Sequence, residues 1–224
     1  MSDYVKQLII QALYILPIML ITLPVHETAH GYAAYKLGDP TAKLMGRLTL
    51  NPAKHFDPVG FLCMIICRFG WAKPVPVNPN NFKNPKRDMA ITALAGPASN
   101  LLMGLCGTVL YTAAYKLLVG VSFESSFALT FFSCLLTFLS YFASINVGLA
   151  VFNLIPIVPL DGSRILYYFL PDRIIYRIRP YERYIQLAMF ALLIFGALST
   201  PLSYVSGKVF NAFYYISDKV TAFI

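Results

Sequence analysis

The sequence predicts an all-α polytopic membrane protein, a bundle of about four to five transmembrane helices with a small β-strand or re-entrant element between the first two spans. Three observations lead to this fold class: hydrophobic residues make up 58% of the 224 residues, only 12% are charged, and the mean hydropathy is +0.63. Soluble domains average about 25% charged residues, and a chain of this size has too little interior to bury so many apolar side chains. We expect one membrane-embedded domain over residues 1–224.

Four apolar stretches are long enough to cross about 30 Å of hydrocarbon. The first contains two prolines, which a membrane helix tolerates where its neighbours satisfy the freed backbone groups, and Gly38 is its stop signal. The second carries Gly96, Gly104 and Gly107, small residues that let helices approach closely. After Pro201 the chain is aromatic and amphipathic, and it either extends the fourth helix or lies at the membrane interface. The predicted spans cover residues 8–37, 89–118, 127–154 and 185–217.

The basic residues indicate how these spans are oriented. Most of the 18 Lys and Arg residues lie in two connections, at 36–87 and 164–183, whereas the turn at 119–126 has Glu124 and no basic residue. The positive-inside rule places both basic connections in the cytoplasm. Because the basic residues lie between apolar segments rather than along one helix face, we interpret the net charge of +8 as a topology signal and expect a lipid bilayer, not nucleic acid, as the partner.

The connection between the first two spans is too long for a simple loop. Residues 47–50 alternate between polar and apolar types as a strand does, and the proline-rich run at 71–77 favours extended chain. Between them, the apolar run at 61–67 is too short to span, so it is expected to be re-entrant or embedded in the membrane surface. These features predict small strands beside the helical bundle.

An HExxH motif lies near the cytoplasmic end of the first span, at residues 26–30. His26 and His30 are about 40° apart on the helix and one turn apart along it, so both imidazoles can bind one ion. Glu27 lies about 60° from His30, close enough to address a metal-bound water. Ionisable groups at membrane depth are costly and usually functional, so we predict one Zn²⁺ per chain at this motif.

A catalytic zinc site needs a third protein ligand. Asp161 is one candidate, since it follows the third span on the side where the HExxH motif lies. His55 and Asp57 are alternatives in a turn-rich segment, where a solvated turn is the commoner explanation.

HETAH at the end of one span and PLDG after a later one resemble the site-2 protease family of intramembrane zinc metalloproteases. Further strings fit the same resemblance: TLNP at 49–52, FGWAKPVPV at 69–77, GPASN at 96–100 and the run from Asn153 to Gly162. Together they cover the chain from about Pro24 to Arg164. Their order and spacing make the match specific, which a lone HExxH would not be.

The resemblance implies a role for each matching residue. His26, His30 and Asp161 would be the zinc ligands, and Glu27 would be the general base. Asn153 would hold substrate or stabilise the oxyanion. The implied substrates are single-span, membrane-anchored proteins cut within or near their transmembrane helices. This sequence is expected to lack the PDZ insertion and CBS pair that many relatives carry.

Two other functions are weighed against this one. A non-hydrolytic zinc-binding membrane scaffold is disfavoured because Glu27 and Asp161 are both present, and a degenerate enzyme would be free to lose the glutamate. A metal-ion transporter usually has polar ligands on facing helices, but the second and fourth predicted spans carry no acidic residue or histidine.

Overall fold

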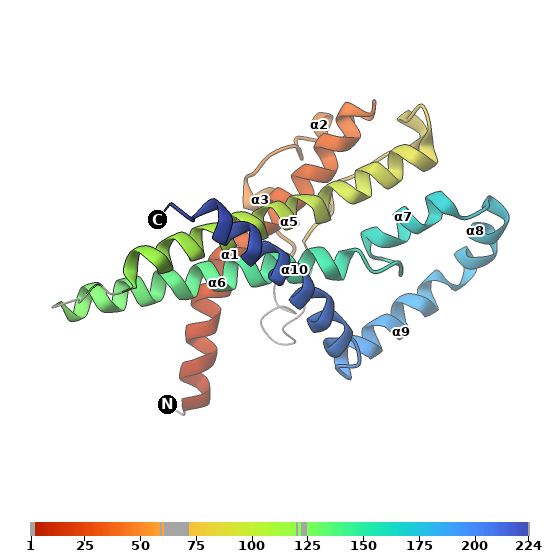
Figure 1. The fold of residues 1–224 in the computed structure, drawn as a ribbon. Coiled ribbons are helices and arrows are strands. Elements are labelled where there is room, and N and C mark those ends of the chain that lie inside the picture. Colours follow the sequence, from red (N-terminus) through yellow and green to blue (C-terminus); the bar gives the residue numbers. More distant parts are fainter. Residues whose placement is uncertain (1–2, 59, 61–71, 120, 122–124, 224) are drawn as a thin grey trace.

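The computed structural model describes residues 3–58, 60, 72–119, 121 and 125–223. In these residues all regular secondary structure is helical, and irregular segments connect the helices (Figure 1). The elements are α1 (Asp3–Lys36), α2 (Thr41–Leu44), α3 (Pro52–His55), η1 (Pro79–Asn81), α5 (Pro85–Leu118), α6 (Ser126–Asn153), α7 (Asp161–Phe169), α8 (Asp172–Ile178), η2 (Arg179–Tyr181), α9 (Glu182–Ile194) and α10 (Ser199–Val220).

Three of these helices are long and apolar enough to cross a membrane, namely Val5–Lys36, Pro85–Leu118 and Ser126–Asn153. This agrees with the first three predicted spans and with the all-α polytopic class. The predicted span at 185–217 is not one straight rod, because α9 and α10 meet at an angle of 81°. Gly196 in the break has a φ of +70°, a left-handed conformation that glycine adopts without strain. If the bent pair counts as one span, the described residues contain four.

The predicted β element is wrong for the residues that the structure describes. Residues 47–50 are irregular and residues 72–78 are extended, but neither segment forms a strand. Side chains occupy the backbone groups that a strand partner would need: the Arg47 guanidinium donates to the carbonyls of Lys73 (2.7 Å) and Pro74 (3.2 Å), and the Val75 N–H donates to a carboxylate on α1. The proposed re-entrant run at 61–67, and Trp71, lie outside the described residues.

Helix α5 is the centre of the bundle and packs against α1, α6, α7 and α10 (Figure 1). Glycines allow the close approach of α5 to α6, as predicted. A Cβ on Gly104 would lie 2.8 Å from the Val147 side chain, and one on Gly107 would lie 2.9 Å from Phe142. Such small-residue contacts replace the hydrophobic driving force that is absent between helices in lipid.

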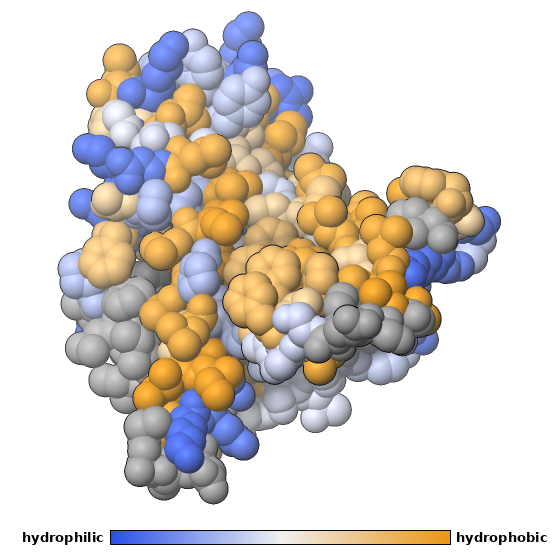
Figure 2. Space-filling model, turned by 90° about the vertical axis from the view of Figure 1, so that its left-hand side faces the viewer, coloured by the Kyte–Doolittle hydropathy of each residue, from blue (hydrophilic) through white to orange (hydrophobic). Residues whose placement is uncertain are grey.

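Large apolar side chains remain on the outside of the bundle. Leu102 and Leu110 on α5 and Phe127 and Leu129 on α6 are all more than half exposed. In Figure 2 apolar side chains cover the middle of the face shown, and hydrophilic ones gather toward its top and its edges. This apolar surface and the three membrane-length helices indicate a multi-pass membrane protein.

A buried carboxylate fixes the chain where α1 ends. Asp39 is fully buried and accepts hydrogen bonds from the backbone N–H of Asn78 (2.7 Å), the side chain of Asn81 (2.7 Å) and both the N–H and hydroxyl of Thr41. Burial opposes ionisation of Asp39, but these hydrogen bonds outweigh it and hold the pKa of the carboxyl below its ordinary value. Asp39 therefore ties the extended segment before α5 to the end of α1.

We expect Asp39→Asn to lower the free energy of unfolding by about 2 kcal/mol at pH 7, because the amide removes a charge that several donors share. A lowered folded-state pKa contributes stability above the ordinary carboxyl pKa, and this contribution is lost as the pH falls through the folded-state value. Thermal unfolding followed by circular dichroism in detergent should therefore show a difference at pH 7 that shrinks in acid. Asp218→Asn, at an exposed ion pair, is the control and should cost little.

Candidate metal centre

The two histidines of the HExxH motif lie one turn apart on α1 and face the centre of the bundle. The Nε2 atoms of His26 and His30 are 3.0 Å apart, and the ring centroids are 4.6 Å apart. His26 is buried and His30 nearly so. The i, i+4 spacing on a continuous helix therefore produces the side-by-side imidazoles that the motif predicts.

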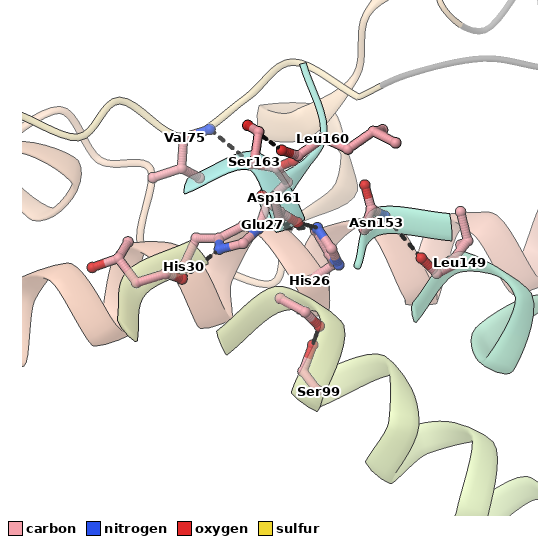
Figure 3. A network of polar contacts seen from close by, with 12 residues as sticks. His26, Glu27, His30, Val75, Ser99, Leu149, Asn153, Leu160, Asp161 and Ser163 are labelled. Carbon is pink, nitrogen blue, oxygen red and sulfur yellow. Dashed lines mark hydrogen bonds and ion pairs between the residues drawn. The ribbon is translucent and has the colours of Figure 1, made fainter. Parts of the chain in front are cut away.

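Asp161 reaches this pair from the first turn of α7 (Figure 3). Its Oδ2 atom lies 3.3 Å from the Nε2 of His26 and 3.3 Å from the Nε2 of His30. Gly162 permits this placement, since a Cβ there would lie 2.3 Å from the Leu154 carbonyl oxygen. The structure thus brings together three ligand-type atoms from segments far apart in the sequence.

The spacing of these three atoms fits a tetrahedral zinc ion. Bonds of about 2.0–2.1 Å at tetrahedral angles put neighbouring ligand atoms about 3.3 Å apart, close to the observed 3.0, 3.3 and 3.3 Å. Two imidazoles and one carboxylate leave the fourth position open, as in catalytic zinc sites.

Helix α5 orients His30 and determines its tautomer. The Nδ1 atom of His30 lies 2.7 Å from the carbonyl oxygen of Thr92. A carbonyl can only accept, so Nδ1 carries a proton, and Nε2, which faces Asp161 and His26, is the nitrogen available to a metal. The His26 Nδ1 atom is buried without a hydrogen-bond partner in the described part of the chain.

Gly96 lets α5 pack directly on both imidazoles. A Cβ at this position would lie 2.3 Å from the His30 Nε2 atom and 2.6 Å from the His26 Cε1 atom. No side chain fits there without displacing the histidines. Glycine is therefore a requirement of the site geometry and not only of helix packing.

Asp161 is ionised at neutral pH. Burial opposes the ionisation of its carboxyl group, but the two imidazoles 3.3 Å away, when protonated at Nε2, favour the carboxylate and lower its pKa to about 2. The group is thus a carboxylate, which is the form that ligates metal.

Glu27 is half-buried and held by the extended segment beside α1. Its Oε2 atom accepts a hydrogen bond of 2.8 Å from the Val75 backbone N–H (Figure 3). A carboxylate has two oxygens, so this contact fixes one and leaves the other for proton transfer. Arg47, which is buried, secures the same segment through the carbonyls of Lys73 and Pro74.

The structure does not bring the rival ligand to the histidines. His55 is buried in α3, and its Nε2 atom lies 2.7 Å from the Thr49 carbonyl oxygen. The Thr28 hydroxyl donates to the same carbonyl (2.7 Å), so this turn is fastened to α1 within the HExxH motif. Neither His55 nor Asp57 belongs to the His26, His30 and Asp161 group found among the described residues.

Asn153 is the last residue of α6 and lies in the neighbourhood of the cluster (Figure 3). Its Nδ2 atom donates to the Leu149 carbonyl in its own helix, at 3.0 Å. Its contribution to substrate or oxyanion binding stays a prediction.

Sequence reasoning missed the partners that shape the cluster. These partners use backbone groups, as Thr92 and Val75 do, or contact residues distant in the sequence, as Arg47 does. Such contacts leave no local pattern in the sequence. Gly96 was expected to aid helix packing, but its contact with the imidazoles depends on how α1 and α5 are aligned. The GPASN string was the only signal available.

Comparisons with known proteins show the family to which the chain is similar. The sequence profile described as Peptidase family M50 matches residues 14–196. The chain is 38% identical over 200 residues to YwhC of Bacillus subtilis, which is named as a candidate zinc metalloprotease; the match covers 89% of this chain and 86% of YwhC. It is also 30% identical over 169 residues to Rip2 of Mycolicibacterium smegmatis and 28% identical over 147 residues to Rip2 of Mycobacterium tuberculosis, both named in the same way.

These two matches cover 72% and 64% of this chain and span 60% and 52% of the mycobacterial proteins. No solved structure matches the chain. The profile and the similarity to YwhC show the class: the protein is a metalloprotease of a membrane-embedded type. It belongs to peptidase family M50, which confirms the resemblance to the site-2 proteases.

Proposed function

We propose that this protein is an intramembrane zinc metalloprotease that hydrolyses peptide bonds within or near the transmembrane segments of membrane-anchored proteins. One observation carries the proposal: two imidazoles and a carboxylate, spaced as zinc ligands are, lie at one end of a membrane-length helix beside Glu27. The names of the relatives support zinc as the metal. His26, His30 and Asp161 would hold one ion per chain.

Zinc, when bound, supplies Lewis acidity that polarises a peptide carbonyl and lowers the pKa of water to about 7. Glu27 is positioned by the Val75 N–H, so its carboxylate is held in place before substrate arrives. It accepts the proton of the attacking water and delivers it to the nitrogen of the leaving amine. Thr92, through His30 Nδ1, keeps that imidazole in the tautomer that can ligate metal.

We further propose that the site faces the cytoplasmic side of the membrane. The HExxH motif lies in the last third of α1, close to the basic connection that follows it, and Asp161 precedes the second basic connection. Under the positive-inside rule both connections are cytoplasmic. Water for hydrolysis would then enter from that side.

The proposal is tested by reconstituting the purified protein in bilayers with tagged single-span membrane proteins. A fragment cut within or near the transmembrane segment should form, disappear when a chelator strips the metal, and return when Zn²⁺ is added. A fragment that persists in protein shown to be free of metal would contradict the zinc mechanism.

We expect Gly96→Ala to weaken zinc binding by about 10–100-fold, the range seen when groups that orient metal ligands are disturbed. The added methyl group must push the imidazoles of His26 and His30 off their positions. Metal content after dialysis against a zinc buffer measures the effect. Gly148→Ala is the matched control, because no atom lies within 4 Å of a Cβ at that position of α6. Equal zinc binding by both variants would mean that the α5 contact does not shape the site.

A further inference from the structure

A cavity of about 250 Å³ lies between the start of α5 and the helices α7 and α8. It is separate from the candidate metal centre and has no part in the mechanism above. Its lining combines charged groups with apolar surface, and the residues used below are Lys86, Met89, Arg164, Tyr167, Asp172 and Arg179. We refer to it as the basic pocket.

The charges of the basic pocket do not balance. Lys86 Nζ pairs with the Asp172 carboxylate at 3.1 Å and also donates to the Leu170 carbonyl. Arg164 and Arg179 also line the cavity, and within the described ranges neither guanidinium has a carboxylate at ion-pair distance. Two positive charges thus remain for an anionic ligand.

The helices beside the pocket expose tyrosine and arginine side chains of the kind found at a membrane interface. Ile174, Tyr176, Tyr181 and Tyr184, in α8, η2 and the start of α9, are 41%, 69%, 62% and 69% exposed. Arginines alternate with them at 173, 177, 179 and 183. Tyrosine and arginine side by side are typical of the headgroup level of a bilayer, where one end of a side chain is apolar and the other is hydrated.

The apolar part of the lining is less exposed than the basic part. Met89 on the first turns of α5 is half-buried and Tyr167 on α7 is buried, whereas Arg164 and Arg179 are exposed. A ligand with a charged group at one end and hydrocarbon at the other matches this gradient. A guanidinium also binds the oxygens of an oxyanion such as phosphate in bidentate fashion, which favours such a group over a simple halide.

We propose that the basic pocket binds the phosphate headgroup of an anionic phospholipid, with Arg164 and Arg179 on the phosphate and the glycerol and first methylenes against Met89 and Tyr167. Basic pockets between helices on the cytoplasmic side of a membrane protein suit such headgroups. The lipid would fasten α7 and α8 to the start of α5. This inference does not depend on proteolysis.

The test counts bound lipid by native mass spectrometry of the full chain in neutral maltoside detergent, with phosphatidylglycerol or phosphatidylcholine titrated in. We expect one retained phosphatidylglycerol and no retained phosphatidylcholine. Each guanidinium near an anionic headgroup contributes about fivefold, so R164Q/R179Q should bind phosphatidylglycerol about 25-fold more weakly. R164K/R179K keeps both charges but loses the bidentate geometry, so it should bind phosphatidylglycerol more tightly than R164Q/R179Q and less tightly than the wild type. R173Q/R177Q removes the same charge from exposed residues outside the pocket and is the matched control.

Circular dichroism of each variant checks that it is folded, which is expected because Arg164 and Arg179 are exposed. Equal phosphatidylglycerol binding by the wild type and R164Q/R179Q would overturn the proposal, and so would equal losses in R164Q/R179Q and R173Q/R177Q. Glycerol 3-phosphate and inorganic phosphate form the last arm. If either binds as tightly as phosphatidylglycerol, the pocket is a site for free phosphate and not for lipid.

Discussion

Glu27→Gln is expected to abolish detectable hydrolysis while leaving zinc bound. Glutamine keeps the size of the side chain and can still accept the Val75 N–H through its amide oxygen, so α1 and the extended segment stay in place. It cannot take a proton from water, and loss of a general base costs about 10²–10⁴-fold in rate. The rate of fragment formation from a reconstituted single-span substrate measures the loss.

Zinc content measured on the same samples is the control for Glu27→Gln, because the glutamate is not among the three ligand atoms. This pair of measurements also separates the proposed protease from a non-hydrolytic zinc scaffold. A scaffold would bind zinc in both forms and release no fragment from either. Cleavage by Glu27→Gln at the wild-type rate would remove the glutamate from the mechanism.

Asp161→Ala is expected to lose both zinc and activity. The substitution removes one of three ligand atoms and leaves two imidazole nitrogens 3.0 Å apart. Two histidines do not make a catalytic zinc site. Metal analysis after purification at limiting zinc, together with the fragment assay, measures both losses.

His55→Gln is the matched control for Asp161→Ala, since His55 is the ligand that the sequence left as an alternative. Its ring bonds to the Thr49 carbonyl, which a glutamine amide can replace as donor, so zinc should be retained. The opposite outcome, zinc lost from His55→Gln and kept by Asp161→Ala, would show that the third ligand was wrongly assigned.

The sequence predicted which side chains of the candidate site lie together better than it predicted what surrounds them. HExxH places two histidines on one helix face because helical geometry is local. Asp161 could be placed only through topology and the family resemblance, and the structure brings it to 3.3 Å from both imidazoles. Glu27 was expected to face a metal-bound water. Its contact with Val75 joins residues distant in the sequence, and no local sequence pattern predicts this contact.

The prediction of the fold was correct where the length of an apolar run determines a helix. It was wrong where side chains take the backbone hydrogen bonds that a strand would need. Three long apolar runs became three helices. The segment at 47–50 had a strand-like pattern and the run at 71–77 an extended, proline-rich one, but Arg47 and Glu27 hydrogen-bond to backbone groups at 73–75, so no ladder forms there. The fourth span breaks at Gly196, and a glycine within an apolar run does not by itself reveal an 81° bend.

The candidate ligands come from two helices far apart in the sequence, α1 and α7. This separation bears on how the enzyme is made. A ribosome produces His26 and His30 early, but Asp161 follows only after α5 and α6 have been synthesised. A truncated chain, or one with α6 threaded the wrong way, would leave the carboxylate missing or across the bilayer. An unfinished chain therefore lacks one of the three candidate ligand atoms, so the metal centre can assemble only after α5 and α6 have been made.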